Sequence, residues 1–239
     1  MPDETPDVRV AACCVGKSGS EGMTDWISHH LAIGFDHLYM YNNGSLDRFK
    51  GIMDEQTMEQ ASIVDFNVEQ GEEYIVEAYA DCYRSHRNEY DWMAFFGPDE
   101  YLLLQYGDSI KQTLRIKAFR KFDAVRVNLM DFSDYIQLCR DLGVDAEDIV
   151  DFRKIDSNKK IARSIVNCKA RGLLLGPYSP KRNGQTVRQC LPNLVEVYDS
   201  KNVGEYKGVE IDKVDTNFMY ITPNKLELQW WKWKNQKGY

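Results

Sequence analysis

The sequence lacks the patterns that mark several common classes of protein. Its six cysteines form no C-x-x-C pair and show no metal-ligand spacing with histidine, and it has only four histidines, none after His86. No apolar run approaches the roughly 20 residues that a membrane span needs. Residues 1–7 are acidic and contain no apolar core, so they predict no secretory signal. We therefore expect a soluble, cytoplasmic enzyme whose thiols are free and mostly buried.

Two familiar catalytic motifs are also missing. Gly16-Lys17-Ser18 looks like the end of a phosphate-binding P-loop, but that motif needs a glycine at position 11, which is Ala11. No Gly-x-Ser-x-Gly elbow occurs, so a Ser/His/Asp hydrolase has little support. Cysteine–histidine catalysis has no motif behind it.

The sequence contains fewer basic than acidic residues. Thirty basic against thirty-seven acidic residues give a net charge of −7, which argues against a nucleic-acid partner. The C-terminal third is more basic, with Lys159, Lys160, Arg163, Lys169, Arg171, Lys181, Arg182 and Arg188. These residues form either a solvated surface or a local patch for a phosphorylated ligand or an anionic lipid surface. Peripheral membrane contact therefore stays open.

What the chain has is the composition and rhythm of an α/β domain. It contains 239 residues, of which 43% are hydrophobic and 12% aromatic, enough for one large core. Strands are predicted at 8–15, 37–41, 63–66, 92–96 and 124–129. Helices are predicted from a cap at Thr24 to Gly34, at 74–89 and at 109–119, and as a terminal helix from Tyr220 that contains Trp230, Trp231 and Trp233. The alternation predicts a mostly parallel sheet flanked by helices, in a single domain spanning 1–239.

Three segments mark predicted strand ends where a ligand can bind. They are Val15-Gly16-Lys17-Ser18, Tyr41-Asn42-Asn43-Gly44 and Phe96-Gly97-Pro98-Asp99-Glu100. In an open α/β sheet, ligands bind beyond the carboxyl ends of the strands. Asp99 could there coordinate Mn²⁺ or Mg²⁺, which prefer oxygen ligands. The alternative is an ordinary β-turn, because Gly-Pro-Asp suits turn positions.

The two neighbouring histidines of the first helix are predicted to differ in role. Adjacent residues on a helix do not face the same way. We expect one of the pair, His30, to face the core as a hydrogen-bonded packing residue.

Two blocks of the sequence resemble glycosyltransferases of family 92. Asp25-Trp26 through His29-His30 to Asn42-Asn43-Gly44-Ser45-Leu46-Asp47 is similar to the family's Glu-Trp-x-x-x-His, a strand, then Asp-Asn-x-Ser-x-Asp. Asp91-Trp92 through Phe96-Gly97-Pro98-Asp99-Glu100-Tyr101 is similar to Trp-x-x-Phe-x-Asp-x-Asp-Glu-Phe. The resemblance is strong over residues 8–105 and vague afterwards.

The resemblance implies a GT-A fold and a glycosyltransferase that takes a nucleotide-sugar donor, with UDP as the expected nucleotide. Residues 8–105 would form the donor-binding half and residues 106–239 the acceptor-side half. Donor-binding roles carry over to Val15, Gly16 and Lys17 for the base, Asn42 and Asn43 for the nucleoside, and Pro98 and Asp99 for the diphosphate. Asp99 matches the last acid of the Asp-x-Asp motif and is the implied metal ligand. Arg84 is a candidate contact to the diphosphate or ribose.

The sequence departs from the family pattern at several positions. Gly97 stands where the first acid of the motif is expected, Asn42 replaces an acid, and Asp25 replaces the usual glutamate. Because no histidine follows His86, a downstream histidine ligand cannot exist in this sequence. We expect Mn²⁺ or Mg²⁺ to bind more weakly than in the family. A metal-independent or inactive relative stays open.

The catalytic step is less constrained than the donor. An inverting transfer of a hexose or deoxyhexose needs a carboxylate base near the acceptor hydroxyl. Asp131 and Asp134, just past the strand at 124–129, are the candidates, with a turn-capping role for Asp131 as the alternative. A retaining mechanism, in which the leaving diphosphate is stabilised by the metal and side chains, also stays open.

Two other interpretations of the whole chain remain. It could be a catalytically impaired GT-A domain that binds without transferring, or a nucleotidyltransferase, although the glycine- and arginine-rich N-terminal loop of that class is missing. Glycan acceptor contacts are expected in the C-terminal half. Tyr178, Trp230 and Trp231 could stack on sugar rings there or simply belong to the core.

Overall fold

The computed structural model describes most of the N-terminal half of the chain and parts of the remainder. The described residues are 7–16, 23–42, 55–66, 73–104, 109–129, 162–175, 180–182, 187–192, 194, 196–197 and 219–222. Within them, no helix has the length and apolarity to cross a bilayer.

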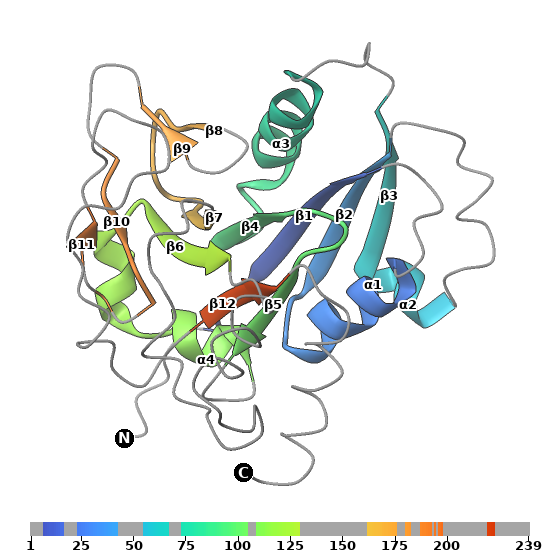
Figure 1. Cartoon of the computed structure of the whole chain (residues 1–239), viewed down its shortest axis with the longest axis horizontal. Coiled ribbons are helices and arrows are strands. Elements are labelled where there is room, and N and C mark those ends of the chain that lie inside the picture. The colour runs from blue at the N-terminus through green and yellow to red at the C-terminus, as the bar shows by residue number, and fades with distance from the viewer. Residues whose placement is uncertain are drawn as a thin grey trace, which may run out of the picture.

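One mixed sheet organises these residues (Figure 1). Its parallel part is built from β3 (Ala61–Asp65), β2 (His37–Asn42), β1 (Val10–Gly16) and β4 (Trp92–Phe96), in that order. The antiparallel strand β7 (Ala162–Asn167) follows β4 and pairs on its other side with β6 (Ala124–Leu129). β6 therefore runs in the same direction as β1, β2 and β4.

Shorter strands extend the sheet beyond β6. β10 (Gln189–Cys190) is parallel to β6 and antiparallel to β11 (Glu196–Val197). β12 (Met219–Thr222) pairs with β6 and with β5 (Tyr101–Leu104). β8 (Leu174–Leu175) and β9 (Pro180–Lys181) form a separate two-stranded hairpin.

Helices cover both faces of the sheet because its central strands are apolar on both. Along β1, Val10, Ala12 and Cys14 belong to one buried cluster, and Ala11, Cys13 and Val15 to another, as the two-residue period of a strand requires. The first cluster includes residues of α1 (Met23–Ala32) and α4 (Ile110–Leu114). The second includes residues of α3 (Glu73–His86), while α2 (Glu55–Gln60) lies beside β3.

Several predicted elements are confirmed. The strands at 92–96 and 124–129 have the predicted bounds, and β1 and β2 begin or end within two residues of theirs. α1 ends as predicted at Gly34, which has a φ of 99°. Phe35 N–H donates to His30 O at 3.2 Å and Gly34 N–H to Leu31 O at 3.0 Å, the bonds that close a helix around a left-handed glycine.

Other predictions are wrong. Thr24 lies inside α1 and does not precede it. The helix expected at 109–119 divides into α4 and a 3₁₀ helix at Lys117–Lys121, because the backbone of Ile116 (φ −57°, ψ 113°) leaves the helical region. Tyr220 opens no helix, since Met219–Thr222 is the strand β12. Trp230, Trp231, Trp233 and Tyr178 lie outside the described residues.

The thiols behave as packing groups. Cys13, Cys14, Cys82, Cys168 and Cys190 are free and buried, as expected. Burial raises the pKa of the Cys168 thiol to about 12 and that of the Cys14 thiol further. These thiols are therefore protonated at neutral pH and are poor nucleophiles.

Candidate active site

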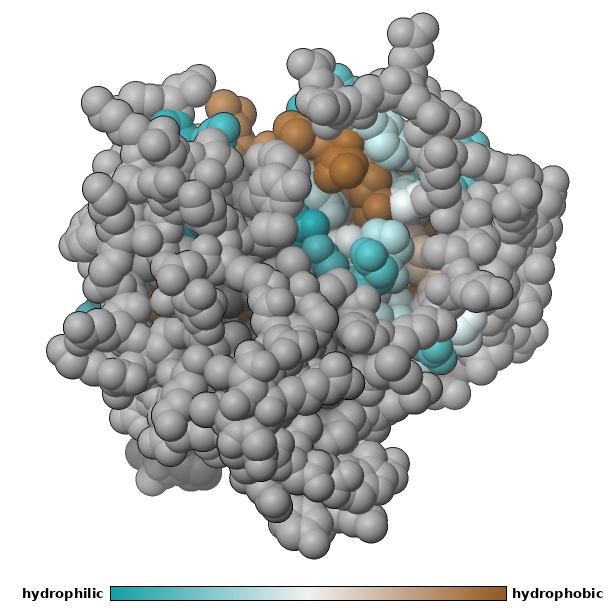
Figure 2. Space-filling model, in the orientation of Figure 1, coloured by the Kyte–Doolittle hydropathy of each residue, from teal (hydrophilic) through white to brown (hydrophobic). Residues whose placement is uncertain are grey.

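The carboxyl ends of the parallel strands meet at one edge of the sheet. The register pairs Gly16 with Asn42 and Cys14 with Phe96, so β1, β2 and β4 end side by side. A Cβ atom built on Gly16 would lie 3.0 Å from Pro98 Cγ. Glycine at position 16 thus lets the turn after β4 close over the end of β1. Figure 2 shows a recess beside α3 in which apolar surface adjoins polar surface.

Of the predicted donor-binding residues, five lie together at this edge. Val15 and Asn42 are buried, Gly16 and Pro98 are partly exposed, and Asp99 beside Pro98 is exposed. Because the Val15 side chain belongs to the core, only its backbone can face a ligand here. Lys17 and Asn43 lie outside the described residues, so their roles stay predictions.

The Trp-His block of α1 holds the backbone that follows Asp99. Trp26 Nε1–H donates to Glu100 O at 2.8 Å, and His29 Nε2–H donates to Leu102 O at 2.7 Å. His30 Nδ1–H donates to Trp26 O at 2.8 Å, which leaves Nε2 to accept from Leu102 N–H at 3.3 Å. The block therefore attaches α1 to β5 and fixes the far side of the 97–100 turn.

Both histidines of the block are buried. His30 is fully buried, as predicted, and His29 is 2% exposed. The contrast in their roles predicted from sequence is therefore wrong: both are hydrogen-bonded to the β5 backbone. The two rings lie 5.1 Å apart at 85°.

Burial, with His29 next to it, holds the pKa of His30 well below its ordinary value of 6.5. The folded state thus keeps His30 neutral while the unfolded chain takes up a proton as pH falls through that value. We expect the free energy of unfolding to fall as pH is lowered from about 7 to about 5, by at most roughly 1.4 kcal/mol per pH unit from this group. Urea titrations of the wild type and of His30→Gln across this pH range measure the pH dependence of the free energy of unfolding. An equal pH slope in both proteins would contradict the assignment. His37, whose pKa burial also lowers, contributes in the same direction to both.

Glu100 fixes the other side of the turn. Its carboxylate accepts from Arg163 Nε–H at 2.6 Å and from Arg163 Nη2–H at 2.5 Å, a bidentate pair. It also accepts the Gly97 backbone N–H at 2.7 Å. The side chain of Glu100 is 7% exposed and that of Arg163 is 15% exposed. Of the two neighbouring acids, Glu100 is therefore engaged within the protein and Asp99 faces solvent.

Arg163 is the residue at this site that sequence reasoning missed. It lies on β7, 63 positions from Glu100, in a region where no central strand was predicted. In the sequence it is only one of several basic residues in the C-terminal third. No local signal in the sequence pairs it with Glu100.

Gly97 is accommodated by the same turn. A Cβ atom built on it would lie 3.0 Å from Asp99 Oδ1 and 3.3 Å from Glu100 Cδ. An aspartate in this position would meet both neighbouring carboxylates at close range. The turn is therefore built for glycine, and a second acid does not fit it without a shift.

This tight approach gives a prediction for Gly97→Ala. The added methyl group is expected to displace the Asp99 carboxylate, because Glu100 is held by Arg163 and cannot give way. We expect a loss of about 1 kcal/mol in the free energy of unfolding. Mn²⁺-dependent stabilisation by a nucleotide-sugar is expected to weaken severalfold. Urea unfolding and thermal shift measure the two effects, and full retention of both would contradict this geometry.

α3 lies against the same strands and places Arg84 away from the turn. Tyr79 Oη–H donates to Phe96 O at 2.9 Å, which anchors the helix at the end of β4. Arg84 lies more than a turn further along, is 72% exposed, and has Nη2 3.6 Å from Asp81 Oδ1. Asp81 in turn accepts from Tyr41 Oη–H at 2.9 Å. No contact given by the described residues joins Arg84 to Asp99, and its donor contact stays a prediction.

The two candidate bases, Asp131 and Asp134, lie outside the described residues. β6, which precedes them, ends at Leu129. Since β6 runs in the same direction as β4, it ends at the same edge of the sheet as Asp99. Their catalytic role stays a prediction.

A divalent metal would find one exposed carboxylate in the turn after β4. Among the described residues, no group of three or more His, Cys, Asp or Glu side chains is gathered to hold a metal ion. Glu100 is occupied by Arg163, which leaves Asp99 as the exposed acid of the turn. A hard cation fits this donor set only if a bound ligand and water supply the other oxygens.

The parallel β3-β2-β1-β4 order, the antiparallel β7 and the acidic turn after β4 define a GT-A-type α/β transferase fold. The sequence model of glycosyltransferase family 92 matches residues 13–168, which is more than half of the chain. The chain belongs to glycosyltransferase family 92. No curated protein matches the sequence significantly.

Among solved structures, the chain is similar to S. aureus TarS, with 7% sequence identity and a TM-score of 0.40. The alignment covers 64% of this chain and 24% of the TarS chain. A likeness at this level adds nothing to the assignment.

Proposed function

We propose that the chain transfers a hexose or deoxyhexose from a UDP-sugar to a hydroxyl group of a glycan acceptor. The observation that carries the proposal is the acidic turn after β4. Its backbone is held by Trp26 on one side, and Glu100 is neutralised by Arg163 on the other. Asp99 is left as the exposed acid of this turn, at the edge where β1, β2 and β4 end.

The donor would lie along this edge. The base would meet the end of β1 at Val15, Gly16 and Lys17, and the nucleoside would approach Asn42 and Asn43. The diphosphate would then lie beside Pro98 and Asp99. A divalent cation, Mn²⁺ or Mg²⁺, would neutralise diphosphate charge and stabilise its departure when held by Asp99.

The protein's own groups carry the remaining steps. Hydrogen bonds to Trp26 and Glu100 fix the backbone of the turn that carries Asp99, so little backbone ordering is required on binding. Asp131 or Asp134 would accept the proton of the acceptor hydroxyl as it attacks the sugar, if the transfer inverts. The leaving diphosphate keeps the electron pair of the broken glycosidic bond.

Thermal shift with a panel of nucleotides and nucleotide-sugars tests donor binding. A ligand that binds only the folded state at about 100 times its Kd stabilises it by about 2.7 kcal/mol. For a chain of this size that corresponds to a rise of about 5–10 °C in Tm. We expect a UDP-sugar with Mn²⁺ to give the largest shift. No shift with any nucleotide or nucleotide-sugar at about millimolar concentration would contradict the proposal.

A second function has one specific observation in its favour. Gly97 stands where the family motif has its first acid, and a side chain there would crowd Asp99 and Glu100. A GT-A domain that binds a donor without transferring its sugar would be consistent with that loss. Such a protein would show the thermal shift but release no free sugar from the donor.

A further inference from the structure

Exposed basic side chains gather at the edge of the sheet opposite the candidate active site. β6 is antiparallel to β7 and parallel to β10. The C-terminal end of β7 therefore lies beside the N-terminal ends of β6 and β10. Asn167 N–H donates to Asp123 O at 2.9 Å, and Asp123 N–H to Arg188 O at 2.7 Å. We call the exposed residues carried by these segments and by β9 the basic edge: Arg120, Lys121, Lys169, Arg171, Lys181 and Arg188.

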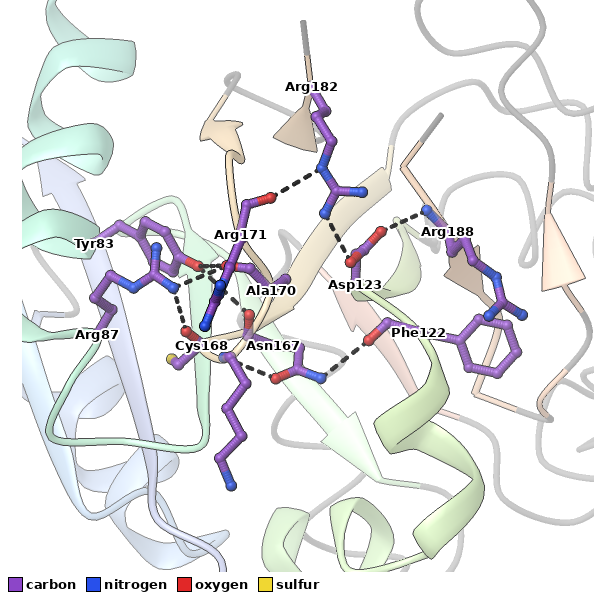
Figure 3. A network of polar contacts seen from close by, with 11 residues as sticks. Tyr83, Arg87, Phe122, Asp123, Asn167, Cys168, Ala170, Arg171, Arg182 and Arg188 are labelled. Atoms are coloured by element: carbon purple, nitrogen blue, oxygen red, sulfur yellow. Dashed lines mark hydrogen bonds and ion pairs between the residues drawn. The ribbon is translucent and has the colours of Figure 1, made fainter. Parts of the chain in front are cut away.

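The acids at this edge are engaged within the protein. Asp123 accepts from Arg182 Nη2–H at 2.9 Å and from Arg188 N–H at 2.9 Å, and it is 17% exposed (Figure 3). Arg182 also donates from Nε to Arg171 O at 3.0 Å, which ties the β8–β9 hairpin to the start of β6. Asp91 lies 3.0 Å from Lys169 Nζ, and the exposed Glu89 bonds with His86. Among the described residues, the six basic side chains thus outnumber the acids beside them, in a chain of net charge −7.

The hairpin adds an apolar group between two of these charges. Leu174 of β8 is 52% exposed, while Leu173 and Leu175 on either side are buried. The cross-strand partner of Leu174 is Lys181, and Arg171 lies three residues before Leu174 in the sequence. Within the described part of the chain, Leu174 is one of three large apolar side chains that are exposed, and Met58 and Ile75 are the other two.

We infer that the basic edge docks on an anionic lipid surface, with Leu174 entering the headgroup region. Basic side chains are attracted to an anionic leaflet by electrostatic interactions that salt screens. An exposed leucine can also be buried among the lipid headgroups, whereas a soluble polyanion offers no apolar environment for it. Docking in this way turns the carboxyl edge, and with it Asp99, away from the bilayer. The candidate active site would then stay open to an acceptor in solution.

Vesicle sedimentation of the full chain tests the inference. Vesicles of phosphatidylcholine alone are compared with vesicles containing about one third phosphatidylserine, at low and at raised salt. We expect binding only to the anionic vesicles, weakened by salt. Arg171→Gln with Lys181→Gln is expected to reduce binding roughly tenfold or more, because each basic residue near the surface contributes about fivefold. Leu174→Ser is expected to reduce it while leaving the salt dependence intact.

The control variant changes net charge by the same two units elsewhere. Met58→Glu with Gln60→Glu places both charges on exposed positions of α2, beside β3 at the far side of the sheet. It should sediment like the wild type, and the Tm of each variant confirms that it is folded. Equal binding of the Arg171/Lys181 variant and the wild type, or no preference for anionic vesicles, would overturn the inference. Binding to an RNA oligonucleotide or to free glycerophosphate without binding to vesicles would also overturn it.

Discussion

Asp99→Ala is expected to remove the Mn²⁺-dependent part of the stabilisation that a UDP-sugar gives. Asp99 is the exposed carboxylate of a turn whose other acid, Glu100, is bound to Arg163 and to Gly97 N–H. Because Glu100 is engaged in this way, no other acid of the turn is available to replace Asp99 as a cation ligand. We expect the Tm shift with Mn²⁺ to fall to the value without metal, and transfer activity to fall by roughly two to three orders of magnitude.

Two controls isolate the role of the carboxylate. Asp99→Asn keeps the size of the side chain and should lose the same metal response. Asp65→Ala removes another exposed carboxylate, at the end of β3 on the same edge, and should keep it. A Mn²⁺ response that survives in Asp99→Ala would show that the metal, if bound, has other ligands.

Arg163→Met is expected to cost about 3–5 kcal/mol in the free energy of unfolding. The substitution leaves the 7%-exposed Glu100 carboxylate without its bidentate partner, and an uncompensated buried charge is expensive. Replacing both partners, as Arg163→Met with Glu100→Gln, should recover much of the loss. Urea unfolding of the two single variants and the double variant gives the coupling energy between them.

The same substitution should also weaken donor binding, since Glu100 fixes the turn that carries Asp99. The Arg182–Asp123 pair offers a matched control because both side chains are 17% exposed and lie at the opposite edge. Arg182→Met should lose comparable stability and keep the donor-dependent Tm shift. If Arg163→Met bound the donor as the wild type does, Glu100 and Arg163 would be structural residues with no influence on the site.

The sequence alone was enough to predict the parallel half of the sheet. β1, β2 and β4 are apolar runs closed by turn residues, and β6 alternates apolar residues with Arg126 and Asn128, so their limits could be predicted within one or two positions. The same runs place Val15, Gly16 and Asn42 at one edge, and the close contact of Gly16 with Pro98 joins the first and third predicted strand ends.

The strands that complete the site could not be predicted. β5 is four residues long and follows a turn at once, so its apolar run carries no period. β7 begins Ala-Arg-Ser, and the polar Arg163 and Ser164 conceal a strand that lies between β4 and β6. Arg163 is partly buried there because Glu100 accepts its hydrogen bonds. That cause lies in the tertiary structure and leaves no local pattern in the sequence. Likewise, no pattern in the sequence indicates that both His29 and His30 form hydrogen bonds with the β5 backbone.

Release of sugar from a UDP-sugar donor, measured with Mn²⁺ and a candidate glycan acceptor, tests the central claim most directly. We expect transfer to the acceptor, slow hydrolysis when the acceptor is left out, and loss of both in Asp99→Asn. A protein that binds the donor with a clear Tm shift but neither transfers nor hydrolyses it would contradict the claim and identify a binding domain.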